Sequence, residues 1–459
     1  MRRVETEILS VRVDMPAKNI WIALNEKKEK LYKDHFPYGS FLDSAGGLGP
    51  IYYSPDKHHI AIKINNDRKQ FLLIDGKKSN SYDKVSDITF SPDSTRVGYV
   101  AKVGKKHMIV INGKEGNQFD EINAMGIFSP DNKHVAYRAV RDGKSFIVID
   151  GKEGKQYDCM CGPKFSPDSK RIAYLAMIGK KECIVIDDKE GKFYDAANLP
   201  SFSPDGKHYA YVAEESKKFF VVIDGKEIKQ YDRVANIVVS PDNKRIAYIA
   251  LEGWKWFVVV DGNESKHYFQ YGESYAGGDT NFGLDREGVD DIEKIGPVFS
   301  PDGTHLAYVA NDGMKRFVVI DGKEQKQYDY VSNIIFSPDS KQCAYTAIEN
   351  KKKFIVIDGK EGEQYSMSID FSCAEDLQFS PDSKHIVYVC SEFMKEGSIV
   401  YDGMRLKEEY HIIQAVGRNA GKTIIFDSSD SFHYLAVKYL YRDEYETAYK
   451  IYLVEQHLQ

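Results

Sequence analysis

The sequence repeats one pattern of about 37 residues along almost its whole length. Residues 165–195 read FSPDSKRIAYLAMIGKKECIVIDDKEGKFYD, and residues 202–232 read FSPDGKHYAYVAEESKKFFVVIDGKEIKQYD. A fixed period of this kind indicates an array of small structural units, each of which buries its apolar residues against its neighbours. The Ser-Pro-Asp triplet of the pattern begins at Ser54, Ser91, Ser129, Ser166, Ser203, Ser240, Ser300, Ser337 and Ser380, and a degenerate tenth copy begins at Phe426.

Each copy predicts four short strands, which we call a, b, c and d in chain order. Strand a ends at the triplet, whose proline and aspartate favour a tight corner. Strand b follows, for example KRIAYLA at 170–176, and strand c is a continuous apolar run such as FIVIDG at 354–359, so both its faces should be covered. Asp-Gly after strand c predicts a type I′ hairpin, and strand d ends in Tyr-Asp.

A four-stranded antiparallel sheet of this length is one blade of a β-propeller. We therefore predict an all-β fold of about ten blades spanning residues 1–459, with eleven as the alternative. Residues 6–14 read as a strand b, and 19–34 as strands c and d. The C-terminus reads as strands a, b and c, so pairing of the two ends would close one large ring. Two smaller propellers in series, with a boundary in the inserted loop 263–296, are the alternative.

The pattern FSPDGK…AYVA…FVVIDG resembles the WD-like repeats of TolB-like β-propellers, and also the propeller domains of prolyl-oligopeptidase-type enzymes. The resemblance extends from about residue 19 to 459. It departs from the WD type, because no Gly-His and Trp-Asp pair occurs, and from the enzymes, because no catalytic or helical domain is attached. The resemblance thus implies a propeller and leaves its activity open.

Composition excludes several classes of partner. A net charge of -6 disfavours nucleic acid, whose phosphates need a basic surface. No apolar run is long enough for a membrane helix, and no signal-peptide core follows the N-terminus, so we expect a cytoplasmic protein, or a periplasmic or secreted one if a leader was removed. Six cysteines in a chain of this length predict buried free thiols in preference to a disulfide framework.

Two short motifs imitate catalytic ones without fitting them. GESYAGG at 272–278 has Ala276 where a nucleophile elbow needs its final glycine, which comes one position too late at Gly277. GRNAGKT at 417–423 is one residue too short for a phosphate loop, and strand-like text follows it. Cys159 and Cys161 have no second pair to complete a zinc site. We therefore predict no catalytic residue, no metal site and no cofactor.

Strand alternation assigns the loops to two rims. The a–b corners and c–d hairpins form one, the corner rim; the b–c and d–a loops form the other, the loop rim. The loop rim carries repeated basic pairs, read either as solvated tips that protect edges or as a ring that steers an anionic partner. Those basic stretches are Lys105-Lys106, Lys180-Lys181, Lys217-Lys218, Lys315-Arg316 and Lys351-Lys352-Lys353.

The sixth repeat differs from the others on the loop rim. It has a tryptophan in its b–c loop, a second at 256 that we assign to the core between blades, and the insertion 271–295, which holds seven acidic and two basic residues. Aromatic anchors beside charges suit a contact surface. The candidate binding residues are Trp254, Tyr271, Tyr275, Asp279, Asn281 and Phe282.

We hypothesise a non-catalytic scaffold that binds a protein or peptide through the loop rim, centred on this insertion. One alternative is a propeller that binds or hydrolyses a glycan or peptide in its central channel, where Asn198, Asn236 and Asn333 recur at the start of strand a. Another is a structural component of a larger assembly.

Overall fold

The computed structural model contains strands and turns, with no helix among the residues it describes. No membrane-spanning helix is therefore found in that part of the chain. The chain divides into two compact units: unit 1 is Met1–Lys164, Lys395–Ser398 and Lys407–Gln459, and unit 2 is Phe165–Met394 and Ile399–Leu406. The described residues are 2–14, 19–24, 51–56, 58–66, 69–123, 128–253, 255–269, 296–312, 315–366, 371–392, 398–406, 411–412, 424–429, 431–442 and 446–457.

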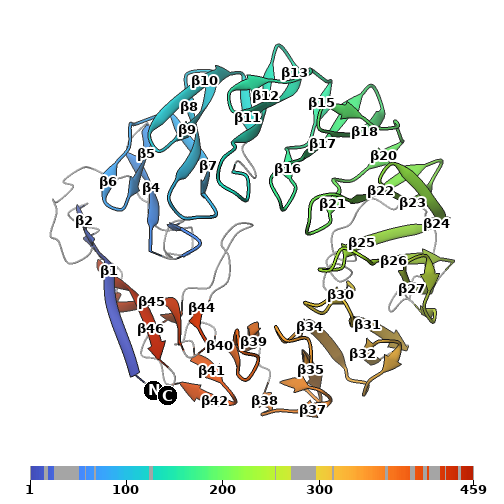
Figure 1. Ribbon diagram of the computed structural model, residues 1–459. Coiled ribbons are helices and arrows are strands. Elements are labelled where there is room, and N and C mark those ends of the chain that lie inside the picture. Colours follow the sequence, from blue (N-terminus) through green and yellow to red (C-terminus); the bar gives the residue numbers. More distant parts are fainter. Residues whose placement is uncertain are drawn as a thin grey trace, which may run out of the picture. The chain divides into compact units, whose positions relative to one another are not determined.

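The strands follow one another in the predicted order a, b, c, d (Figure 1). Position a holds β3 (Ile51–Tyr53), β7 (Lys84–Phe90), β11 (Glu121–Asn123), β15 (Cys159–Met160), β16 (Lys164–Phe165), β20 (Ala196–Ala197), β21 (Ser201–Phe202), β25 (Arg233–Val239), β30 (Val298–Phe299), β34 (Tyr330–Phe336), β39 (Phe371–Phe379), β43 (His411–Ile412) and β44 (Ile424–Ser428). Position b holds β4 (Ile60–Asn66), β8 (Val97–Val103), β12 (Ala136–Arg141), β17 (Ile172–Ile178), β22 (Tyr209–Glu215), β26 (Ile246–Glu252), β31 (Leu306–Asp312), β35 (Cys343–Glu349), β40 (Ile386–Glu392) and β45 (Ser431–Arg442).

Position c holds β5 (Lys69–Ile74), β9 (Lys106–Ile111), β13 (Lys144–Ile149), β18 (Lys181–Ile186), β23 (Lys218–Ile223), β27 (Lys255–Val260), β32 (Lys315–Ile320), β36 (Lys352–Ile357), β41 (Ser398–Tyr401) and β46 (Glu446–His457). Position d holds β6 (Lys77–Lys78), β10 (Lys114–Phe119), β14 (Lys152–Glu153), β19 (Lys189–Glu190), β24 (Lys226–Tyr231), β28 (Asn263–Glu264), β29 (Tyr268–Phe269), β33 (Lys323–Glu324), β37 (Lys360–Glu361), β38 (Tyr365–Ser366) and β42 (Met404–Leu406). In the described part of the chain these strands form ten antiparallel sheets, which confirms the all-β fold and the count of about ten blades.

The Asp-Gly hairpins have the predicted geometry. Asp224 and Gly225, for example, have φ of 47° and 81°, as a type I′ turn requires. Strand b, in contrast, starts two residues later than predicted: β17 begins at Ile172, because the backbone N–H of Arg171 donates instead to the hydroxyl of Ser166 in the corner. Lys170 and Arg171 thus belong to the corner and not to the strand.

Apolar side chains of successive sheets meet face to face within each unit. In unit 2, Phe220 and Val222 of β23 belong to a buried cluster with β17 and β18, whereas Val221, on the opposite face, packs against Tyr248 and Phe257 of the following sheet. Both faces of strand c are therefore covered, as its continuous apolar run predicts. Each buried side chain of this size contributes about 1.5–3 kcal/mol.

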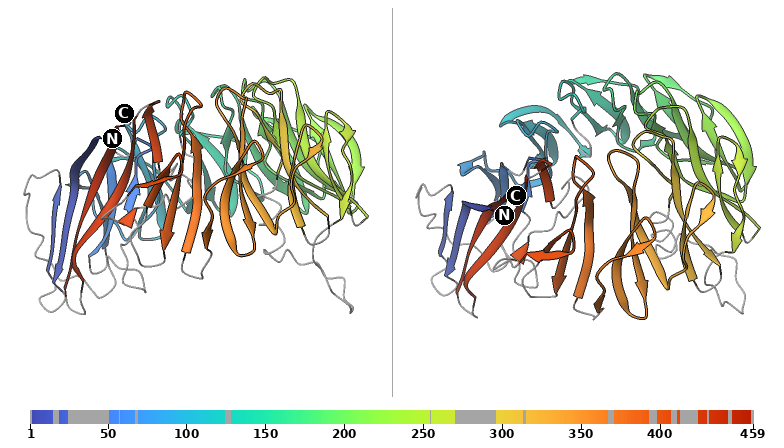
Figure 2. Two further views of the ribbon diagram at one scale, coloured as in Figure 1. Left: turned by 90° about the horizontal axis from the view of Figure 1, so that it is seen from below. Right: turned by 60° about the horizontal axis from the view of Figure 1, so that its bottom comes forward.

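The two ends of the chain share one sheet in unit 1, which we call the terminal sheet. Its strand β1 (Arg2–Asp14) pairs antiparallel with β46, and β2 (Asn19–Leu24) pairs with β1 on the outer side. Figure 2 shows β1 and β46 side by side in both views. The predicted pairing of the ends is confirmed, but β1 is not a strand b: it takes position d, because β46 already fills position c. Closure into one ring stays a prediction.

The Ser-Pro-Asp corner is held by hydrogen bonds to its serine and aspartate. The serine is fully buried in every one of the nine copies. In the copy at 203–205, the Ser203 hydroxyl donates to Asp205 Oδ1 over 2.7 Å and accepts from the His208 N–H over 2.9 Å. The Asp205 carboxylate also accepts from the Lys207 N–H. Proline sets the turn, and these two side chains satisfy its backbone.

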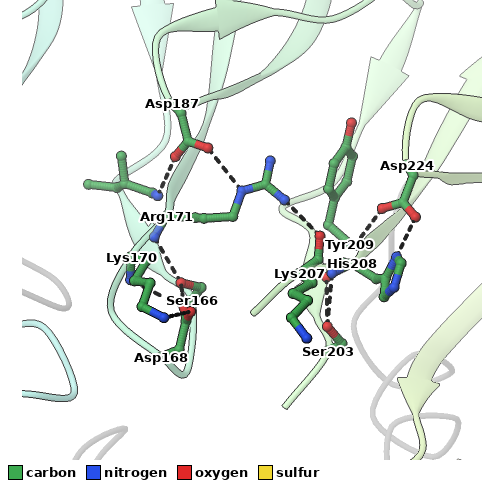
Figure 3. Close-up of polar contacts among 11 residues, drawn as sticks. Ser166, Asp168, Lys170, Arg171, Asp187, Ser203, Lys207, His208, Tyr209 and Asp224 are labelled. Carbon is green, nitrogen blue, oxygen red and sulfur yellow. Dashed lines mark hydrogen bonds and ion pairs between the residues drawn. The ribbon is translucent and has the colours of Figure 1, made fainter. Parts of the chain in front are cut away.

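The corner also meets the c–d hairpin, which confirms that both lie on one rim. Asp224 of the hairpin accepts from the Tyr209 N–H and lies 2.7 Å from His208 Nδ1 (Figure 3). Where arginine replaces this histidine, the side chain reaches further: Arg171 contacts its own hairpin at Asp187 and donates to the carbonyl of Lys207 in the next corner (Figure 3). Histidine or arginine at this position therefore braces the corner.

Neighbouring corners are linked through the residue after the aspartate. This residue has positive φ, and its side chain accepts a hydrogen bond from the preceding corner, as when Asp205 N–H donates to Asn243 Oδ1 over 2.9 Å. At Gly206 no side chain is present, and the Asp168 carboxylate of the preceding corner occupies the space: a Cβ at 206 would lie 2.2 Å from Asp168 Oδ1. The space at 206 is therefore what requires glycine, since Asn243 adopts a similar φ of 63° in the next corner.

We expect Gly206→Ala to destabilise the protein more than Gly322→Ala. Both glycines have positive φ, which costs alanine about 1–2 kcal/mol, but nothing lies within 4 Å of a Cβ at Gly322. The alanine at 206 must also displace the Asp168 carboxylate, at a further cost of about 1–3 kcal/mol. Urea denaturation followed by circular dichroism measures both, and equal midpoints would refute the corner-to-corner packing.

We also expect corner aspartates to make stability fall in acid. Hydrogen bonds from the serine hydroxyl, and then from the backbone amide two residues on, lower the pKa of Asp131, Asp205 and Asp339 to about 2. Because these values lie below the unfolded pKa of about 3.9, the carboxylates stabilise the fold above that pH, and the contribution is lost as pH falls from about 4 to about 2.

The test is the melting temperature between pH 5 and pH 2. The triple variant Asp131→Asn, Asp205→Asn, Asp339→Asn should give a flatter profile than the natural protein, because its amides accept hydrogen bonds without titrating. Asp188→Asn, at an exposed hairpin position, is the matched control. A triple variant with the natural slope contradicts this assignment.

Candidate functional site

On the loop rim, the first lysine of strand c is bound to the aspartate that follows strand d. Lys181 Nζ lies 2.8 Å from Asp195 Oδ1, and Asp195 Oδ2 accepts from the Ser216 N–H in the next b–c loop. The hydrogen bond from Lys181, followed by that from Ser216, lowers the pKa of Asp195. The same ion pair recurs at Lys69–Asp83, Lys106–Asp120, Lys144–Asp158, Lys218–Asp232 and Lys315–Asp329.

These ion pairs bear on the question raised by the basic stretches. The second lysine of the pairs at 106, 181 and 218 is engaged by an aspartate of its own sheet, so its charge is largely neutralised at short range. Lys105 and Lys180 are exposed. The second lysine of each of these pairs thus bonds within its own sheet, and both interpretations of the basic pairs stay predictions.

A second link joins the outer strands of successive sheets. The Tyr194 hydroxyl donates to Glu227 Oε1 of the next sheet over 3.1 Å, and Lys192 Nζ lies 2.8 Å from the same oxygen. The hydrogen bond from Lys192 lowers the pKa of Glu227. The sequence analysis missed this link, although its signal, lysine two residues before tyrosine and glutamate after Asp-Gly-Lys, is visible. It recurs at Lys229–Glu264, Lys266–Glu324 and Lys326–Glu361.

The second residue of strand c is polar in some repeats and aromatic in others. In two repeats its side chain caps the next strand a: Gln70 Oε1 accepts from the Val85 N–H, and Glu182 Oε2 from the Ala197 N–H. In two successive sheets of unit 2, Phe219 and Trp256 occupy this position and are half-buried. Polar capping is thus replaced by aromatic surface in these two sheets.

Trp256 packs where the sequence analysis predicted, against the apolar cluster between two sheets. That cluster contains Ile249 and Val258 of its own sheet and Tyr308 and Phe317 of the next. The strand that precedes the insertion, β29, pairs with β27 at Trp256, and the next described residue is Gly296. A Cβ on Gly296 would lie 3.0 Å from Asn236 Nδ2, so the returning chain passes close to the preceding strand a.

The candidate binding residues themselves lie outside the described residues and stay a prediction. They are Trp254, Tyr271, Tyr275, Asp279, Asn281 and Phe282. The described residues at both ends of the insertion are those of β29 and β30, which places its attachment points in the d–a connection of the sixth repeat, on the loop rim as defined above.

Away from the insertion, the loop rim contains buried polar atoms that form no hydrogen bond with the described residues. Asn311 Oδ1 and Glu349 Oε2 are shielded from solvent and accept no hydrogen bond from the described part of the chain. Lys315 is held between Asp329, at 2.7 Å, and the other carboxylate oxygen of Glu349, at 3.0 Å. Next to this pair, the guanidinium of Arg316 lies 4.5 Å from the centre of the Tyr330 ring. Nothing in the repeat pattern singles out Asn311 or Glu349.

The recurring asparagines at the start of strand a have structural roles. Asn198 Oδ1 accepts from the Val212 N–H over 2.8 Å. Asn236 and Asn333 have φ of 52° and 53° at β-bulges in β25 and β34, a conformation that asparagine tolerates. Their recurrence is therefore explained by the backbone.

The two motifs that imitate catalytic ones and the cysteines complete the comparison with the sequence predictions. GESYAGG at 272–278 and GRNAGKT at 417–423 lie outside the described residues. Of the cysteines, Cys183 and Cys343 are buried thiols as expected, and burial raises the pKa of Cys343 to about 12. The expectation is wrong for Cys159 and Cys161, which are exposed, because the end of strand d and start of strand a are covered only in part.

Comparison of the sequence with protein-family models and with curated proteins finds no match. Among solved structures, the chain is similar to a eukaryotic initiation factor at 10% identity, covering 79% of this chain and 96% of that one, with a TM-score of 0.41. It is similar to TolB from Acinetobacter baumannii at 18% identity, 57% and 79% coverage and a TM-score of 0.26. It is similar to the β-propeller domain of the trilobed protease from Pyrococcus furiosus at 14% identity, covering 70% of this chain and 96% of that one, with a TM-score of 0.29. The chain is also similar to a prolyl endopeptidase at 14% identity, covering 67% of this chain and 54% of that one, with a TM-score of 0.30.

Proposed function

We propose that the protein is a non-catalytic scaffold that binds a protein or peptide through the loop rim, centred on the insertion at 271–295. The observation that carries this proposal is the change in the loop rim at that place. Elsewhere its polar side chains cap strands and pair with one another, whereas here Phe219 and Trp256 present half-buried aromatic surface. A partly exposed aromatic surface with charges around it suits a protein contact.

The charge of the insertion suggests the chemistry of the partner. Residues 271–295 hold seven acidic and two basic residues together with three aromatic ones. A basic, partly apolar peptide complements that composition, with its lysines or arginines facing the carboxylates. The corner rim has little to offer such a partner, because its serine, aspartate, histidine and arginine side chains are engaged in bracing the turns.

Deleting 271–293 should abolish binding and leave the fold intact, because the blades bury their apolar residues without this segment. The measurement is binding to an immobilised array of basic, neutral and acidic peptides, with circular dichroism to check the fold. Tyr271→Ser, Tyr275→Ser, Phe282→Ser keeps the length and charge of the insertion and should also lose binding. Met404→Ser, which removes an apolar side chain 60% exposed next to a c–d hairpin, is the control and should bind normally.

Two results would overturn the proposal. Unchanged binding by the deletion variant would show that the contact surface lies elsewhere. Cleavage of the bound peptides, detected by mass spectrometry, would show that the protein is not a passive scaffold.

A further inference from the structure

A buried histidine in the terminal sheet has one ring nitrogen that no residue in the described part of the chain bonds. His433 of β45 has a side chain that is only 6% exposed, and its Nδ1 lies 2.7 Å from Oδ1 of Asp427 in β44. An ionised carboxylate only accepts hydrogen bonds, so Nδ1 carries the proton and donates it. When the ring is neutral, Nε2 presents a lone pair, and among the described residues it has no hydrogen-bond partner. A buried polar atom left in this way requires an explanation.

A second imidazole lies next to this one. His58, in the corner between β3 and β4, has its ring centre 5.8 Å from that of His433, with the ring planes at 42°. Metal–nitrogen bonds of about 2.0–2.1 Å place the centres of two imidazoles on one ion roughly 5–6 Å apart. The two rings, from the first and the terminal sheets of unit 1, are thus at the spacing of two ligands to a shared ion.

We propose that His58 and His433 bind one divalent transition-metal ion, of which Zn²⁺ is the representative. Imidazole nitrogens are preferred ligands of such ions. Asp427 would have the part that a carboxylate plays behind a metal-binding histidine, fixing the tautomer and the orientation of the ring. Asp56, which accepts from the His58 backbone N–H over 3.0 Å, adds negative charge on the side of His58.

The site has two protein ligands. Among the described residues no group of three or more histidine, cysteine, aspartate or glutamate side chains converges on one point. Solvent molecules complete the coordination, as in metal sites that keep open positions. An ion held in this way joins the first sheet to the sheet that contains both ends of the chain, so its binding also stabilises the folded protein.

The test is isothermal titration of Zn²⁺ into the full chain after removal of metals with a chelator. The natural protein should bind one equivalent at this site, and His58→Ala should weaken that binding about 10-fold or more. Asp427→Asn should weaken it about 10- to 100-fold, the usual effect of losing the carboxylate behind a ligand. His59→Ala is the matched control: it is the next residue in the same corner, but its Nδ1 is already engaged by Asp75 at 2.8 Å.

A second measurement separates metal binding from a structural role of the histidines. Zn²⁺ should raise the melting temperature of the natural protein and of His59→Ala, but not of His58→Ala, which alters an exposed side chain and leaves the fold intact. Co²⁺ in place of Zn²⁺ should give a visible absorption that His433→Gln abolishes. Equal Zn²⁺ affinity of His58→Ala and the natural protein, or no stoichiometric binding by the natural protein, would overturn the proposal and leave a buried water as the partner of Nε2.

Discussion

The structure depends on the fact that a four-stranded sheet with two apolar faces cannot cover either face by itself. In strand c the alternation of Phe220, Val221 and Val222 sends successive side chains to opposite neighbours. Each sheet is therefore stable only between two others, which is why the pattern must repeat and why strand c is apolar throughout. The residues between the apolar runs are then free to position the sheets relative to their neighbours.

Hydrogen bonds between polar groups position each sheet against the next at three places: the corner, the b–c loop and the outer edge. The corner donates to the side chain of the next corner, as Asp205 does to Asn243; the aspartate after strand d accepts from the next b–c loop; and tyrosine at the outer edge bonds a glutamate of the following sheet. All three use residues that the repeat pattern keeps. The polar part of the repeat thus serves the same inter-sheet contacts as its apolar part.

Two places in the chain depart from this regular pattern. Trp256 takes a position that elsewhere caps a strand, and a 26-residue segment between Phe269 and Gly296 follows in the same repeat. In the terminal sheet, Asp427 replaces the corner serine and pairs with His433, which stands where other repeats have an apolar residue. Regular repeats bind their neighbours, and these two places are where we propose that other molecules bind.

The sequence by itself determined the strand order, the hairpin geometry and the stacking, because each depends on local turn chemistry or on which faces of a strand are apolar. Asp224-Gly225 favours a type I′ hairpin, and the apolar run FVVI requires that both faces of its strand be covered. Only the tertiary structure decided that β1 takes position d, that Asp168 occupies the space at Gly206, and that His58 lies beside His433. These contacts join residues from different repeats or from opposite ends of the chain. The periodicity predicts the strands of each repeat, but it does not predict which side chains of two neighbouring sheets contact each other.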